Sequence, residues 1–184
     1  LRVCPGGFLR FGQVIPGSLD VTFGGAEATV AQSIAHMGGA SAFVTALPKG
    51  AIADACVANL QSVGVDTRHI LRPDKGRLGI YFMETGANQR PSTVIYDREG
   101  SSVSITPADS YRWKEIFGGA QWFHVSGITP ALSKTAAEAA LSAARSAKES
   151  GLTVSCDLNF RRKLWKWEQG TDSRELAEKT MRQI

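Results

Sequence analysis

The sequence has few cysteines and few histidines, and neither type is arranged for a metal. Only Cys4, Cys56 and Cys156 occur among 184 residues. Their odd number and the lack of a CxxC spacing exclude a disulfide framework and a zinc or redox pair of that kind. We expect all three to be buried thiols. The three histidines lack metal-ligand spacing, so we expect each of them to be structural or on the surface and assign no metal ligand.

Long hydrophobic runs and a large charge surplus are also missing. No apolar stretch approaches the ~18 residues of a membrane-spanning helix, and the first residues do not resemble a signal peptide. The net charge of +4 comes from 21 basic and 17 acidic residues and is scattered along the chain, which argues against a nucleic-acid partner. We therefore expect a cytoplasmic protein with no membrane partner, for which an acidic small molecule is a possible ligand.

Four common catalytic motifs are absent. The sequence contains no G-x-x-x-x-G-K-[ST], no G-x-G-x-x-G, no H-E-x-x-H and no G-x-S-x-G. P-loop NTPases, Rossmann dehydrogenases, zincins and α/β-hydrolases are therefore poor fits.

The chain does contain an alternation of strand and helix patterns. Helical spacing of apolar residues predicts helices. The clearest of them has a capping box from Thr135 to Glu138 at its start and the stop signal Gly151 at its end. Short β-rich runs lie between the helices, so we expect an α/β fold built from parallel βαβ units. The predicted helices are 26–37, 51–63 and 133–150, and the predicted strands are 42–47, 121–125 and 152–156.

One segment breaks this alternation. Two strand patterns, 79–84 and 92–98, are separated by a turn-rich stretch with no helix between them, which predicts a hairpin. Residues 18–23 also alternate between apolar and polar. Together these strands predict a small antiparallel sheet covering one edge of the α/β body, with a cleft between the sheet and the body.

A glycine pair marks the first candidate site. Gly24-Gly25-Ala26-Glu27 stands where a strand passes into a helix. Two glycines let a ligand approach the backbone, and the first N–H groups of the helix are free to donate. Such a turn suits sugar hydroxyls or an anion, although an ordinary strand-to-helix turn has the same sequence.

The second candidate site is on the hairpin. Side chains alternate along a strand, so Tyr96 and Arg98 share one face while Asp97 points away, and Tyr81 can join them if the register permits. A guanidinium beside two phenols matches a carboxylate carried on a polyol. The alternative is a solvated face on which Arg98 pairs with Glu99 or Asp97.

The third candidate site follows the last predicted strand. Residues 156–165 begin at the carboxyl end of a parallel strand, where open α/β sheets bind ligands. The strand parity places Asn159 and Arg161 toward the cleft. The alternative is a basic helix start with Trp165 and Trp167 packed beneath it, which we accept for Arg162 and Lys166 but not for Arg161.

Three stretches, 23–31, 77–98 and 156–165, resemble the ribokinase-like (PfkB) carbohydrate kinases. The run 80–87 with Tyr96 and Arg98 is similar to the members that act on the sugar acid 2-keto-3-deoxygluconate. The resemblance implies an open, mostly parallel sheet flanked by helices, with an antiparallel lid whose strands lie within about 8–23 and 71–105. It also implies that residues 1–184 are the N-terminal part of a single kinase domain, with the C-terminal part missing.

The resemblance implies an ATP- and Mg²⁺-dependent transfer of phosphate to the terminal hydroxyl of 2-keto-3-deoxy-D-gluconate. It places Asn159 toward the nucleotide phosphates and Arg161 at the polar end of the sugar acid, counts both among the ATP-binding residues, and suggests a homo-oligomer formed through the lid. The implied substrate-binding residues are Gly24, Gly25, Ala26, Glu27, Thr29, Tyr81, Tyr96, Arg98 and Arg161.

Two departures from the family pattern bear on function. Thr29 stands where the family usually has asparagine, so recognition of the sugar hydroxyls is expected to change or to be shared with Glu27. No G-x-G-D segment occurs, so the family's general base is not among these residues and we expect the 184 residues alone to be inactive. The alternatives are a kinase for a neutral sugar such as fructose and a noncatalytic ligand-binding domain on the same scaffold.

Overall fold

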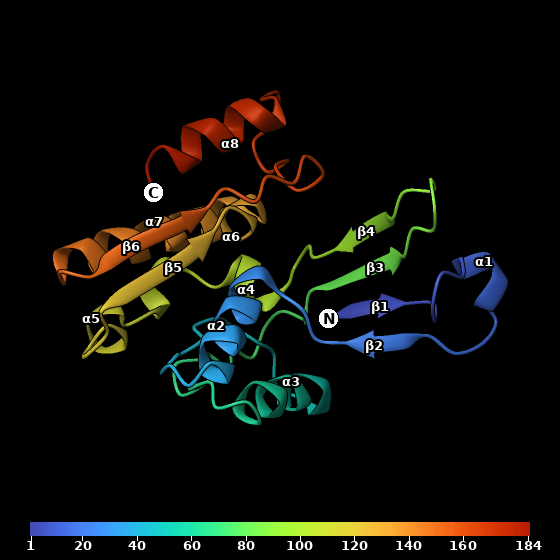
Figure 1. Cartoon of the computed structure of the whole chain (residues 1–184). Helices are drawn as coiled ribbons and strands as arrows, with labels where there is room; N and C mark the ends of the chain where they lie inside the picture. The colour runs from blue at the N-terminus through green and yellow to red at the C-terminus, as the bar shows by residue number, and fades with distance from the viewer.

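The chain forms an α/β body and a protruding sheet, which we call the lid (Figure 1). A computed structural model describes residues 1–184. None of its helices has the length and apolar character that crossing a bilayer requires. In chain order the elements are β1 (Arg2–Cys4), α1 (Phe11–Val14), β2 (Asp20–Thr22), α2 (Ala26–His36), α3 (Ala51–Gln61), β3 (Ile80–Glu84), β4 (Thr93–Asp97), α4 (Ser102–Ile105), the 3-10 helix η1 (Ala108–Ser110), α5 (Trp113–Ile116), β5 (Trp122–Ser126), α6 (Ile128–Ala131), α7 (Lys134–Glu149), β6 (Thr153–Asp157) and α8 (Ser173–Met181).

The lid is a four-stranded sheet in the order β2-β1-β3-β4. The predicted hairpin is confirmed, because β3 and β4 pair antiparallel with Tyr81 opposite Tyr96. The prediction of a purely antiparallel lid is wrong, since β1 pairs parallel to β3 while it pairs antiparallel to β2. The sequence analysis missed β1, a strand of three residues, because so short a run carries no readable period.

The body contains the three predicted helices and one pair of parallel strands. Helix α7 matches the prediction, but Ser133 caps it by accepting a hydrogen bond from the Ala136 N–H, two residues before the predicted capping box. Strands β5 and β6 pair in parallel. Small alanines on α7, among them Ala143 and Ala147, belong to a core cluster against which Phe123 of β5 and Val154 of β6 pack, so the helix lies close to these strands.

Helices α2 and α3 form a second layer with its own core of Ala31, Leu47, Ala53, Leu60, Val65 and Ile70. The strand expected at 42–47 appears only as isolated parallel bridges from Ala42 to Asp66 and from Ala46 to Leu71. The main sheet is therefore less continuous than expected. Its two-stranded part, β5-β6, is a separate sheet in the hydrogen-bond pattern.

Two local expectations are wrong. Cys4 is buried, but Cys56 is half-buried and Cys156 is exposed, because Cys156 lies near the end of β6, whose second edge pairs with no strand. The basic run after β6 does not begin a helix. It forms turns, and the next helix, α8, begins at Ser173. Trp165, with 1% of its surface exposed, anchors this segment against Leu176 and Ala177 of α8.

Candidate functional site

A cluster of two tyrosines and an arginine lies on one face of the lid. Tyr81 and Tyr96 are directly paired across β3 and β4, with ring centroids 6.4 Å apart. The central guanidinium carbon of Arg98 lies 5.0 Å from the Tyr96 ring centroid and 5.6 Å from that of Tyr81. Arginine over an aromatic face is attracted by the ring quadrupole. The strand parity that joined these three residues in the sequence is therefore confirmed as a geometric arrangement.

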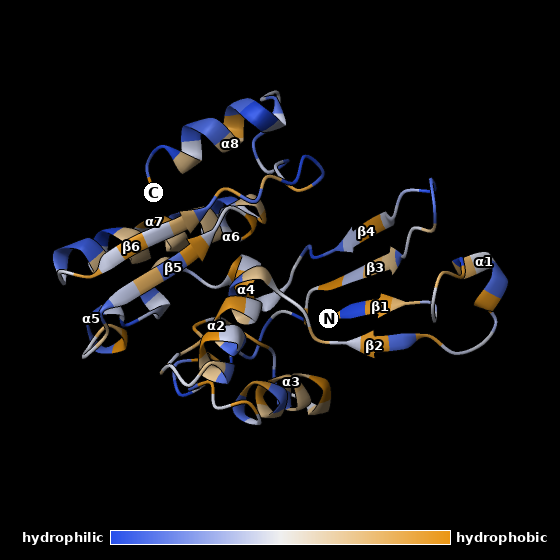
Figure 2. Ribbon diagram, viewed as in Figure 1, coloured by the Kyte–Doolittle hydropathy of each residue, from blue (hydrophilic) through white to orange (hydrophobic).

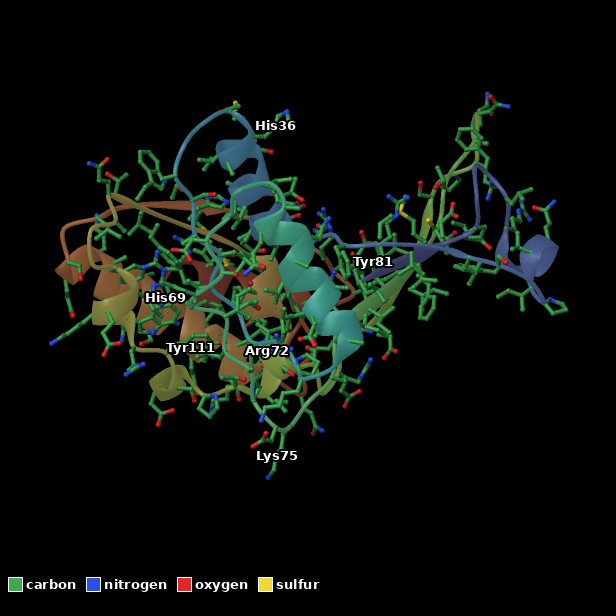
Figure 3. All side chains as sticks on the ribbon, turned by 90° about the horizontal axis from the view of Figure 1, so that it is seen from below. His36, His69, Arg72, Lys75, Tyr81 and Tyr111 are labelled. Atoms are coloured by element: carbon green, nitrogen blue, oxygen red, sulfur yellow. The ribbon has the colours of Figure 1, made fainter.

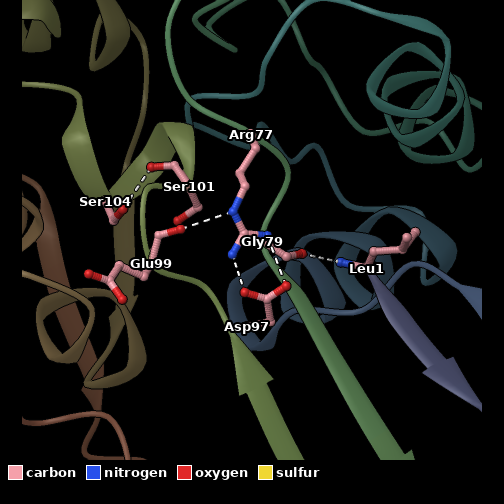
Figure 4. A network of polar contacts seen from close by, with 7 residues as sticks. All are labelled: Leu1, Arg77, Gly79, Asp97, Glu99, Ser101 and Ser104. Atoms are coloured by element: carbon pink, nitrogen blue, oxygen red, sulfur yellow. Dashed lines mark hydrogen bonds and ion pairs between the residues drawn. The ribbon is translucent and has the colours of Figure 1, made fainter.

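The guanidinium of Arg98 is not paired with the neighbouring acids. Asp97 is held by Arg77, whose guanidinium also donates to the backbone oxygen of Glu99 at 3.0 Å (Figure 4). No carboxylate lies within ion-pair distance of Arg98. Burial lowers the pKa of the Arg98 guanidinium. Nearby Tyr96, Tyr81 and Glu27 raise this pKa, and the positive charge of Arg161 lowers it further. The structure therefore favours a half-buried cation available to an anion over the alternative of a local ion pair.

The glycine pair lies beside this cluster. A Cβ atom at Gly24 would be 3.2 Å from the Tyr81 hydroxyl, so the missing side chain is what lets that hydroxyl approach the backbone. Tyr81 itself lies where the lid joins the body (Figure 3). Gly25 is the N-cap of α2, so the first free N–H groups of this helix begin next to the cluster.

Glu27 has a structural role that the sequence analysis did not foresee. Its Oε1 atom accepts hydrogen bonds from the Ser126 N–H at 3.2 Å, from the Ser126 hydroxyl at 2.9 Å and from the Thr129 hydroxyl at 2.7 Å. These bonds tie the start of α2 to the end of β5. One carboxylate oxygen of Glu27 thus joins two elements of the body, while its expected contact with sugar hydroxyls stays a prediction. Ser126 and Thr129 were missed, because nothing in their local sequence points to a partner about 100 residues away.

The segment after β6 differs from the parity prediction. β6 ends at Asp157, whose Oδ1 accepts a hydrogen bond from the Asn159 N–H at 3.0 Å, and Asn159 has a φ of +35°. The chain therefore turns, and side-chain alternation cannot be extended to Arg161. Arg161 is exposed and donates only to the Phe160 carbonyl, at 3.1 Å. It still lies close enough for its charge to affect the pKa of Arg98.

A glycine that the sequence analysis overlooked shapes this end of the sheet. A Cβ atom at Gly127, directly after β5, would be 2.2 Å from the Leu158 carbonyl oxygen. Only glycine therefore allows the chain after β6 to pass so close to the end of β5. The sequence shows a Ser126-Gly127 pair after a strand pattern, but it does not show which distant segment passes close to this glycine.

A cavity of about 250 Å³ adjoins the glycine pair. Gly24, Gly25, Ala26, Glu27 and Arg98 line part of it, and most of the remaining lining is apolar and comes from residues 43–47, β5 and α7. Thr29 is exposed and does not line it, and neither do Tyr81, Tyr96, Asn159 or Arg161. The enclosed part of the site is therefore mostly apolar, and its charged side chains are Glu27 and Arg98.

No group of three His, Cys, Asp or Glu side chains could hold a metal ion. His36 and His69 lie away from Tyr81 (Figure 3). His124 bonds to the Ser155 hydroxyl at 2.8 Å within the β5-β6 sheet.

Comparison with known proteins gives consistent results. The family model described as "pfkB family carbohydrate kinase" matches residues 12–181. A 2-dehydro-3-deoxygalactonokinase of Haloferax volcanii is 35% identical over 161 residues, 88% of this chain and 49% of the relative. Fructokinase-1 of Oryza sativa subsp. japonica is 30% identical over 142 residues, 77% of this chain and 43% of the relative.

Among solved structures, a 2-dehydro-3-deoxygluconokinase from Thermotoga maritima is 47% identical, with a TM-score of 0.84, covering 89% of this chain and 49% of that one. The chain thus spans about half the length of these relatives.

An α/β body with a β lid, and an arginine and two tyrosines beside a glycine turn, agree with the α/β carbohydrate kinases that the sequence resembles. The match over residues 12–181 makes the identification definite: this chain belongs to the pfkB family of carbohydrate kinases.

Proposed function

We propose that the full-length protein is an ATP-dependent kinase that phosphorylates the terminal hydroxyl of the sugar acid 2-keto-3-deoxy-D-gluconate. The observation that carries the proposal is the guanidinium of Arg98, held beside two tyrosine rings without any carboxylate partner. An arginine fork binds a carboxylate through two parallel, charge-assisted hydrogen bonds. A neutral sugar can accept hydrogen bonds from this fork but brings no negative charge to pair with it.

The other residues of the cleft fit such a substrate. The hydroxyls of Tyr81 and Tyr96 can exchange hydrogen bonds with sugar hydroxyls, and the backbone at Gly24 and Gly25 is open to close approach. Arg161 adds a second positive charge, near enough to lower the pKa of Arg98. Phosphoryl transfer depends mainly on positioning and charge neutralisation, and a lid that holds the sugar acid by its carboxylate end would present its far hydroxyl.

We propose ATP as the phosphate donor, since the family consists of kinases. Asn159 and Arg161, at the carboxyl end of β6, would meet its phosphates. ATP chemistry also implies Mg²⁺. The residues present do not fit a metal site, because they form no cluster of three metal-binding side chains, so we assign the ion no ligand here and route no step through it.

The test is a substrate panel on the full-length protein, with kcat/KM measured for 2-keto-3-deoxygluconate, 2-keto-3-deoxygalactonate, fructose and ribose. We expect the two sugar acids to exceed the neutral sugars by about 100-fold, the value of one well-placed ion pair with its hydrogen bonds. A preference for fructose would reject the proposal in favour of a neutral-sugar kinase, which the 30% identity to a fructokinase keeps open. Binding without turnover would favour a noncatalytic domain.

We also propose that the full-length protein assembles through the lid. The register aligns Val21, Val3, Phe82 and Ile95 in one row across all four strands, on the face opposite Tyr81, and each lid strand carries hydrophobic positions (Figure 2). Phe11 covers Phe82 at the centre, but Val21 and Ile95 are 58% and 53% exposed. Light scattering should show more than one copy per particle and a shift toward monomer for Ile95→Lys; a monomeric wild type would refute this.

A further inference from the structure

A single hydrogen bond connects the four lid strands to the later part of the body, which follows Thr106 in the sequence. The ammonium group of Lys163 donates to the backbone oxygen of Val94 at 3.0 Å. Lys163 is exposed and makes no ion pair, so no carboxylate competes for this ammonium. It comes from the loop after β6, and Val94 lies in β4, 69 residues earlier in the chain.

The register explains why the Val94 oxygen is available. β4 is the last strand of the lid, bonded to β3 alone. The Tyr81 N–H donates to Leu1, away from β4, so Tyr81 and Tyr96 form a pair that exchanges no hydrogen bonds. Antiparallel pairs alternate between bonded and non-bonded. The Met83–Val94 pair, two residues further along, is therefore also non-bonded, and the polar backbone groups of Val94 point to the open edge.

The loop that carries Lys163 is fixed at both ends. At its start, the Gly127 N–H donates to the Asp157 carbonyl at 2.8 Å. At its end, Trp165 is buried with 1% exposure. Between these points a turn is closed by the Leu164 N–H bonding to the Arg161 carbonyl at 2.9 Å. Arg161 and Lys163 therefore belong to the same short turn.

We propose that Lys163 is a positioning residue that fastens the open edge of β4 to the body, so that Arg98 on the lid and Arg161 on the body face the same substrate. Val94 is two residues from Tyr96, about 7 Å along the strand, so the fastening point lies beside the tyrosine–arginine cluster. A lid already fastened to the body leaves less ordering for the substrate to impose on binding, which raises apparent affinity. The contact also covers part of an open strand edge.

The test uses Lys163→Met in the full-length protein, which keeps the side-chain length but removes the charge and the donors. The matched control is Lys166→Met, an exposed lysine three residues away that makes no polar contact in the structure. The first measurement needs no substrate: hydrogen exchange of residues 92–98. We expect exchange about fivefold faster in Lys163→Met than in the wild type, normal exchange in the control, and rescue by Lys163→Arg, which retains a donor.

The second measurement rests on the proposed function. KM for the preferred sugar should rise about five- to tenfold in Lys163→Met with kcat within twofold, because closure is affected and not the chemistry. Unchanged exchange would overturn the proposal, even with a raised KM, since Lys163 would then act directly on the substrate. A neutral-sugar preference would reject the proposed function, whereas the exchange result would still decide the role of Lys163.

Discussion

Replacing Arg98 by leucine in the full-length protein is expected to lower kcat/KM for the sugar acid by about 100-fold, roughly 2.7 kcal/mol of transition-state binding. The guanidinium has no internal carboxylate partner, so its hydrogen bonds are free for a ligand anion, and charge-assisted bonds in a half-buried cleft are the strong ones. Leucine keeps much of the apolar contact with the two tyrosine rings but offers no charge. Steady-state kinetics with both a sugar acid and fructose are the measurement.

The neutral sugar provides the internal control for this prediction. Arg98→Leu should change kcat/KM for fructose by less than about threefold, so that the preference for the acid disappears. Arg98→Lys should fall between the leucine variant and the wild type, because an ammonium retains the charge but not the planar fork. An equal loss on both substrates would contradict the prediction, since it would mean that Arg98 supports the lid and does not select a carboxylate.

The arrangement around Arg98 was predictable because local rules determine it. Strand alternation places Tyr96 and Arg98 on one face. The turn-rich stretch between the two strand patterns indicated a hairpin, although the register that opposes Tyr81 to Tyr96 had to come from the structure. Helices 26–37 and 133–150 were predictable for the same reason, because their apolar spacing and stop signals lie within the segment itself.

The errors arose where the structure depends on distant partners or on a break in periodicity. Extending strand parity to Arg161 failed because Asn159 adopts a left-handed backbone conformation, which ends the alternation. The strand expected at 42–47 has only single bridges to residues 66 and 71, and its apolar residues line the cavity instead. Contacts such as Lys163 to Val94 carry no sequence signal at all, because any exposed lysine has the same local pattern.

Glu27 is the clearest case of such a long-range contact, and removing it is expected to have the largest effect on stability. Glu27→Ala should lower the free energy of unfolding of the full-length protein by about 2–4 kcal/mol, because three donors from Ser126 and Thr129 lose their acceptor at once. The first turn of α2 also loses its negative charge, which is favourable at a helix N-terminus. Urea unfolding followed by tryptophan fluorescence is the measurement.

Two variants separate this account from a role of Glu27 in the substrate site. Glu27→Gln keeps an oxygen acceptor and should cost only about 1 kcal/mol, while Glu138→Ala on the exposed surface of α7, where Glu138 makes no hydrogen bond, should change stability by less than about 0.5 kcal/mol. If Glu27→Ala unfolded at the same urea concentration as Glu138→Ala while KM for the sugar rose, the carboxylate would be a ligand for hydroxyls. The start of α2 would then be held to β5 by packing alone, and the three hydrogen bonds to Ser126 and Thr129 would contribute nothing measurable to the fold.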